Sequence, residues 1–198
     1  MSAVIDGPSL HFQDCSARPR CGCKGPGAEA WLRAGGYRVP ATPNSAALDV
    51  DGVLVARLAT SEFLLEATRG SGAGVERVLA TRALLAARAQ PRDVFAVARQ
   101  DGACTISGGG LNDLLRQVCS VDFAPLLAGG AMVHPGTVEE SPVLLTSMVG
   151  IGVLAWPRIA AGEPTVTIWC EPSFGHYFWT TLREVGRDGG NLIEGSDQ

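Results

Sequence analysis

Length, composition and charge set the first limits on this chain. Its 198 residues are 46% hydrophobic, which is enough for one compact domain or for two small subdomains that share a core. The 16 basic and 20 acidic residues give a net charge of −4, and the arginines are scattered along the sequence. Because a nucleic-acid interface needs a clustered basic patch, we expect no nucleic-acid partner.

The sequence also indicates a compartment. The first residues, MSAVIDGPSLHFQD, are neither basic nor continuously apolar, so we expect no secretory signal. The uncharged stretch 141–157 contains two prolines and two glycines, and it predicts two strands and a turn rather than a membrane span. Six cysteines without such a signal favour reduced thiols and a cytoplasmic location.

Two passages of the sequence are similar to each other. CGCKGPGAEAWLRAGGYRVP begins at residue 21, and ACTISGGGLNDLLRQVCSVDFAP begins at residue 103. Each runs from an apolar strand through a glycine turn into a short helix, and strands and a longer helix follow. This repeat predicts an α+β fold made of two related βαββα-type units packed together.

The expected elements of the first unit follow from apolar periodicity and from turn residues. A strand is expected first, then a glycine turn and a short helix, which two glycines end. After a turn-rich loop, a hairpin and a longer helix complete the unit. The predicted ranges are 14–24 for the strand, 28–34 for the helix, 53–58 and 62–67 for the hairpin, and 75–89 for the second helix.

The second unit is expected to repeat this plan. Two strands and a tight turn lead into a helix with leucines at helical spacing, and three strands and a final helix follow. The predicted ranges are 94–99 and 104–107 for the first strands, 111–118 for the helix, 143–148, 152–156 and 165–170 for the next strands, and 173–185 for the last helix. The predicted boundaries are an arm over 1–13, subdomains over 14–92 and 93–186, and a polar tail over 187–198.

The glycine runs 25–27 and 108–110 allow two interpretations. Such a run lets a phosphate approach the backbone at the start of a helix. It also serves a strand-to-helix turn that needs backbone angles favouring glycine. Since both runs occupy the same place in the repeat, we favour the turn.

Cys15, Cys21 and Cys23 give a spacing of C-x5-C-x-C. This spacing differs from the paired C-x2-C of zinc sites, and cysteine is a common small buried residue. We therefore favour structural thiols, and a thiol- or metal-linked regulatory module stays open as the alternative.

The other candidate residues point to no catalytic set and no metal site. His11, His134 and His176 are far apart, and Ser107 lacks the G-x-S-x-G context of a hydrolase nucleophile. The acidic pairs in loops, such as Glu139 and Glu140, are interpreted as solvated surface.

The last predicted helix carries a group of four aromatic residues. At helical spacing at least one of them must point away from the core, and we choose Trp179 as the candidate for a partner contact. The group consists of Phe174, Tyr177, Phe178 and Trp179.

Several segments resemble a known family. DCSARPRCGCKGPGAEAWL resembles the opening of the folate-binding domain of the glycine-cleavage T-protein, and DGVLVARLATSEFLLEA resembles the hairpin that follows it. LNDLLRQVCSVDFAP and EPSFGHYFWTTLREV are similar to the gamma subunit of bacterial heterotetrameric sarcosine oxidase. The resemblance covers residues 14–186, and it rests on the order and spacing of these segments.

This resemblance implies a non-catalytic, gamma-type subunit of a flavin-dependent, sarcosine oxidase-like complex. Such a complex oxidises N-methyl amino acids and passes the one-carbon unit to tetrahydrofolate. The resemblance places the flavin in a partner flavoprotein subunit and implies that this chain by itself binds no cofactor. If the chain does bind a ligand, the resemblance makes tetrahydrofolate the candidate.

The chain also departs from the catalytic members of the family. Asp51 matches the first of two adjacent acidic residues before the family's hairpin, but Gly52 replaces the second and Thr68 replaces an asparagine. Asp51 is therefore interpreted either as a remaining pterin contact or as a turn residue before a strand. The alternative function is a free-standing, tetrahydrofolate-binding, aminomethyltransferase-like protein.

Overall fold

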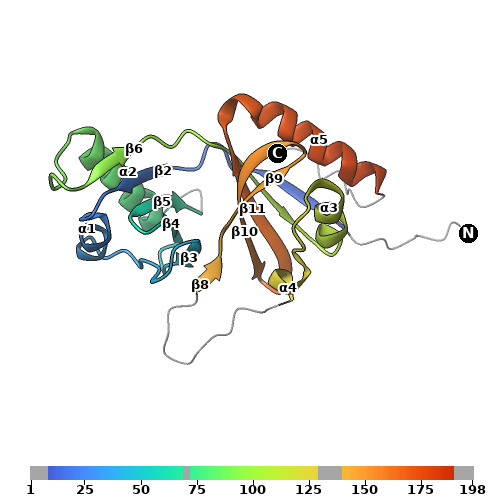
Figure 1. The fold of residues 1–198 in the computed structure, drawn as a ribbon, viewed down its shortest axis with the longest axis horizontal. Coiled ribbons are helices and arrows are strands. Elements are labelled where there is room, and N and C mark those ends of the chain that lie inside the picture. Colours follow the sequence, from blue (N-terminus) through green and yellow to red (C-terminus); the bar gives the residue numbers. More distant parts are fainter. Residues whose placement is uncertain (1–8, 69–71, 129–139, 190–198) are drawn as a thin grey trace, which may run out of the picture. The chain divides into compact units, whose positions relative to one another are not determined.

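A computed structural model describes residues 9–68, 72–128 and 140–189, and it divides into two compact units (Figure 1). Unit 1 comprises Met1–Ser16, Asp101–Gly130 and Leu144–Gln198, and unit 2 comprises Ala17–Gln100 and Ala131–Val143. Each unit is built on one antiparallel sheet with helices packed on it. The expected mixture of helices and strands is confirmed.

Unit 2 contains a six-stranded sheet with the order β6-β2-β5-β4-β3-β8. Its helices are α1 (Ala28–Ala34) and α2 (Ala73–Ala86). Its strands are β2 (Arg20–Lys24), β3 (Ser45–Leu48), β4 (Val53–Ala59), β5 (Glu62–Ala67), β6 (Phe95–Val97) and β8 (Glu140–Pro142).

The core of unit 2 follows from strand alternation. Phe63 and Leu65 of β5 and Cys23 of β2 point to the same side of the sheet, because side chains alternate along a strand. Val78 and Leu85 of α2 are seven residues apart on one helix face and pack onto them.

Unit 1 contains a five-stranded sheet with the order β1-β7-β11-β10-β9. The helices α3 and α5 contribute Leu114, Leu115, Phe178 and Leu182 to its core, against Ile168 of the sheet. Its strands are β1 (His11–Asp14), β7 (Gly102–Ser107), β9 (Leu144–Met148), β10 (Ile151–Ala160) and β11 (Glu163–Cys170). Its helices are α3 (Leu111–Val118), α4 (Ala124–Leu127), the 3-10 turn η1 (Pro172–Phe174) and α5 (Gly175–Asp188).

The two sheets share an order of elements. In unit 2 the chain runs β2-α1-β3-β4-β5-α2, and in unit 1 it runs from β7 through α3 to β9-β10-β11 and α5. Three strands therefore lie between the helices of each sheet; the sequence predicted three for the second unit but only two for the first. β6 pairs with β2 in one sheet, and β1 pairs with β7 in the other.

The glycine runs are strand-to-helix turns, as the repeat predicts. Gly25 follows β2 with a φ of 125°, and Gly108 follows β7 with a φ of 120°. A side chain at Gly25 would collide with the backbone carbonyl of Asp93, and one at Gly108 would collide with that of Ser9. Glycine is needed at both positions because of the backbone angle and because another segment passes so close.

The predicted strand 14–24 is wrong in its extent. The structure has β1, then a turn in which the Ser16 amide donates to the Asp14 carboxylate at 2.8 Å, and then β2. Pro19 lies between the strands and cannot donate a ladder hydrogen bond. Part of the expected arm 1–13 belongs to β1, and residues 1–8 lie outside the described part.

The structure shows which positions of two helices face the core. Leu79 of α2 is 37% exposed, whereas Thr81 is buried on the core side of that helix. In the C-terminal segment, Phe174 precedes α5 and is 49% exposed, and Tyr177 on α5 is 53% exposed. The core-facing aromatic residue of α5 is Phe178, with Leu182 one turn later on the same side.

We expect Gly108→Ala to lower the free energy of unfolding by at least about 2 kcal/mol, because the new side chain meets both an unfavourable φ and the Ser9 carbonyl. Gly152→Ala is the matched control, since Gly152 lies in β10 with open space around it. Urea unfolding of both variants checks this. An unchanged midpoint for Gly108→Ala would contradict the role of the turn.

Candidate functional site

The turn before β4 positions Asp51, the residue that the sequence selects as a pterin contact. The carboxylate of Asp49 accepts hydrogen bonds from the backbone amides of Asp51 at 3.1 Å and Val53 at 2.9 Å. This side-chain turn fixes the loop and orders the start of β4. Asp51 keeps 36% of its side chain exposed, whereas Asp49 keeps 8%.

Arg77 on α2 holds both carboxylates of this turn. Its Nη1 atom lies 2.7 Å from Asp49 Oδ2 and 2.7 Å from Asp51 Oδ2. Its Nη2 atom donates to the carbonyl of Gly36 at 3.0 Å, and its guanidinium lies over the ring of Tyr37 at 4.5 Å. Two carboxylates and one guanidinium leave this group with a net charge of −1.

The electrostatics of Arg77 follow from these contacts. Burial by itself lowers the pKa of Arg77, but the charge of Asp49 and hydrogen bonds to both carboxylates raise it overall. The guanidinium is therefore permanently charged and holds the Asp51 carboxylate by an ion pair. A pterin would have to share that carboxylate with Arg77.

Tyr37 links the loop after α1 to α2. Its hydroxyl donates to the carbonyl of Arg77 at 3.0 Å and lies 2.6 Å from Thr81 Oγ1. Burial raises the pKa of Tyr37, so the phenol stays protonated at neutral pH. The buried Thr81 thus has a polar partner, which explains why a threonine is tolerated on the core side of α2.

A pocket of about 410 Å³ opens between α1 and α2, and we call it the α1–α2 pocket. It lies within unit 2, and Arg77 forms part of its wall. This volume is in the range of small-ligand sites. Its lining includes Trp31, Tyr37, Arg77, Ala80, Thr81 and Leu84.

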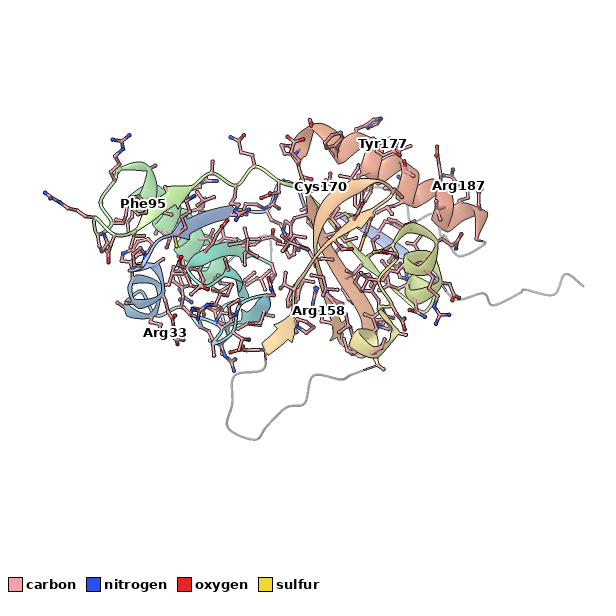
Figure 2. The ribbon with its side chains drawn as sticks, viewed as in Figure 1. Arg33, Phe95, Arg158, Cys170, Tyr177 and Arg187 are labelled. Atoms are coloured by element: carbon pink, nitrogen blue, oxygen red, sulfur yellow. The ribbon has the colours of Figure 1, made fainter. Side chains whose placement is uncertain are left out.

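Unit 1 carries a row of polar side chains across its sheet. Arg158 Nη1 on β10 donates to Thr167 Oγ1 on β11 at 2.9 Å, and Thr167 lies 3.1 Å from Thr105 Oγ1 on β7. Cys15 Sγ lies 3.4 Å from Thr105, and the Arg158 guanidinium lies 3.9 Å from the ring of Trp156 (Figure 2 labels Arg158). These contacts satisfy polar groups on the sheet face that α3 and α5 do not cover.

The six cysteines are all buried thiols that form no disulfide in this structure. Burial raises the pKa of Cys21 and Cys23 from 9.0 to about 12, and burial also raises the pKa of Cys104 and Cys170. In the described ranges, no group of three or more His, Cys, Asp or Glu side chains is arranged to hold a metal ion. A metal-linked role for Cys15, Cys21 and Cys23 gains no support from this geometry.

The remaining sequence candidates lie on separate elements of the two units. Trp179 on α5 is half-buried, and its indole packs edge-on against Phe12 with ring centroids 6.0 Å apart. Glu140 is wrongly interpreted as solvated surface, because its carboxylate accepts from the Ala41 amide at 2.7 Å and from the Ser45 hydroxyl at 3.2 Å. His134 and Glu139 lie outside the described residues.

The sequence did not identify Arg77 as the partner of Asp51, because Arg77 is one of many scattered arginines. It also did not identify Tyr37, which lies in the loop after α1 and contacts Arg77. The signal that could have found them is the pair of acidic residues, Asp49 and Asp51, which needs a cation when partly buried. Which arginine supplies the charge depends on how α2 packs beside the loop.

No described helix is both long enough and apolar enough to cross a membrane. No protein-family model and no curated protein matches the sequence of this chain.

Comparison with solved structures identifies the fold. One similar chain comes from heterotetrameric sarcosine oxidase of Corynebacterium sp. U-96, in complex with pyrrole 2-carboxylate, with a TM-score of 0.66 and 22% identity over 94% of this chain and 88% of that chain. Another is glycine cleavage system aminomethyltransferase T from Bartonella henselae, with a TM-score of 0.55 and 16% identity over 88% of this chain. This chain spans 45% of that aminomethyltransferase. These matches confirm the fold that the sequence resemblance implied.

We expect the native thiols to resist an aromatic disulfide reagent at about pH 8 and to react once the chain is unfolded, because a thiol with a raised pKa holds almost no thiolate.

The same raised pKa values make the stability depend on pH. Below the ordinary pKa of 9.0 the contribution of the neutral thiols to the free energy of unfolding is complete, and it is lost as the pH rises towards 12. Chemical unfolding at several pH values measures this loss, and Cys23→Ala should make it less steep. Fast labelling of the folded protein would contradict the prediction.

Proposed function

We propose that this chain is a non-catalytic, gamma-type subunit of a heteromeric, flavin-dependent, sarcosine oxidase-like complex. In this proposal the complex acts on N-methyl amino acids and transfers the one-carbon unit to tetrahydrofolate. The flavin belongs to a partner flavoprotein in this proposal. The cytoplasm is the proposed location, because six cysteines in a sequence with no expected secretory signal favour reduced thiols.

The observation that carries the proposal is the match in length. The chain covers 88% of its counterpart from a heterotetrameric sarcosine oxidase, but only 45% of aminomethyltransferase T. A chain that corresponds to nearly the whole of one member of an assembly is suited to act as a subunit. The match to aminomethyltransferase T spans less than half of that enzyme, so it supports a shared fold rather than that enzyme's activity.

The internal repeat supports the same assignment. The two sheets share their order of elements, and a glycine with a left-handed φ lies between β2 and α1 in one and between β7 and α3 in the other. We propose that the two units are related by duplication.

The exposed aromatic residues of the C-terminal segment are candidates for a partner contact. Trp179, the residue selected from the sequence, is half-buried, while its neighbours Phe174 and Tyr177 expose about half of their side chains (Figure 2 labels Tyr177). Since aromatic residues are enriched at the centres of interfaces, we propose that Trp179 contributes to such a contact together with these two.

We expect the tagged chain to co-purify from its native cells with a yellow flavoprotein that demethylates N-methyl amino acids. The flavin absorbance of the eluate and its demethylating activity are the measurements, and cells carrying the tag on an unrelated protein give the background. Recovery of the chain alone and colourless would count against the proposal.

Tetrahydrofolate binding is the second candidate function, and the partly exposed carboxylate of Asp51 favours it. If the isolated chain is a folate-binding protein, calorimetric titration with tetrahydrofolate should release heat and raise the melting temperature. Asp51→Asn should weaken that binding. Because Arg77 already forms an ion pair with this carboxylate, we expect the isolated chain to show neither heat of binding nor a raised melting temperature.

A further inference from the structure

The α1–α2 pocket has the composition of an interface centre. Trp, Tyr and Arg are the residue types that dominate binding energy at protein interfaces. Trp31, Tyr37 and Arg77 all contribute to this one pocket, where Leu84 is 47% exposed and Ala80 is also exposed. An exposed leucine beside an open aromatic pocket is a surface that a partner's apolar side chain can cover.

The wall of the pocket is held in place before any partner arrives. Arg77 is fixed by two carboxylates, by the Gly36 carbonyl and by the ring of Tyr37. The Tyr37 hydroxyl is in turn fixed by Thr81 and by the backbone of α2. A preorganised wall lowers the entropy cost of binding, because these side chains do not have to be ordered by the partner.

The charge beside the pocket is negative. Arg77 is outnumbered by Asp49 and Asp51, and Asp51 is the more exposed of the two carboxylates. Glu29 of α1 pairs with both Arg33 and Arg57. It lies on the side of the helix opposite Trp31 and Gly35, because successive helical residues are rotated by about 100°. At the Arg77 end of the pocket, the carboxylates of Asp49 and Asp51 therefore favour a ligand that carries a positive charge.

We propose that the α1–α2 pocket is a docking site for a segment of the partner flavoprotein that inserts one large apolar side chain and places a lysine or arginine beside Asp51. This proposal rests on the proposed function and names the surface that the partner contacts on unit 2. The apolar anchor fills the space between Trp31 and Leu84, and its basic neighbour offsets the net charge of −1 at the turn.

The test compares two tryptophan variants of the full chain. Ala80→Trp fills the pocket from an exposed helix position, and Ala83→Trp places the same side chain at an exposed position of α2 that does not contribute to the pocket. The affinity of each variant for the flavoprotein recovered with the wild-type chain is measured by titration. We expect Ala80→Trp to bind at least about tenfold more weakly, and Ala83→Trp to bind like the wild type.

A charge variant tests the second half of the proposal. Asp51→Asn should weaken binding by about threefold to tenfold and should make the affinity less dependent on salt, because one attractive charge is lost. Asp188→Asn, an exposed change at the end of α5, is the control for removal of one negative charge. Circular dichroism and melting curves confirm that all four variants are folded.

The outcomes separate this inference from the proposed function. If the wild-type chain binds the flavoprotein and Ala80→Trp binds equally well, the docking site is wrong and the subunit assignment stands. If Ala80→Trp and Ala83→Trp weaken binding equally, the pocket has no special role and the docking site is again wrong. If the wild-type chain binds no flavoprotein, both the proposed function and the docking site are wrong.

Discussion

The close passage of one backbone segment over another, where β2 leads into α1 and where β7 leads into α3, constrains the rest of the fold. Gly25 and Gly108 have left-handed φ values, and the carbonyls of Asp93 and Ser9 occupy the space where their side chains would be. The amide of residue 28 or 111 then donates back to the glycine carbonyl and starts the first helix. Each helix can pack on its sheet only because the chain turns this sharply.

A second constraint is the arginine that joins α2 to the loops of unit 2. Arg77 connects the turn before β4, the loop after α1 and the ring of Tyr37. Partly buried carboxylates without a cation are costly, so the two aspartates and the arginine stabilise one another. The same contacts give the α1–α2 pocket its rigid wall and its net negative charge, so the stability of the loop and the character of the pocket have a common origin.

The sequence was a sufficient guide where one physical signal dominates. The helix Leu111–Val118 was predicted with its observed bounds, because glycines precede it and its leucines recur at helical spacing. The hairpin of β4 and β5 was predicted because two apolar runs flank a short polar turn. The prediction failed for β3, whose residues SAAL have small side chains and lie in a segment rich in turn residues.

What the sequence determined by itself was most of the helices and strands and the repeated glycine turns, since these depend on local periodicity, backbone angles and residue type. Only the tertiary structure decided which strands that are distant in the chain are neighbours, because β1 pairs with β7 across about ninety residues of chain. It also decided that Arg77 is the partner of Asp51 and that α1 and α2 leave a pocket between them. Those features depend on how distant segments pack, and no local pattern of residues specifies that packing.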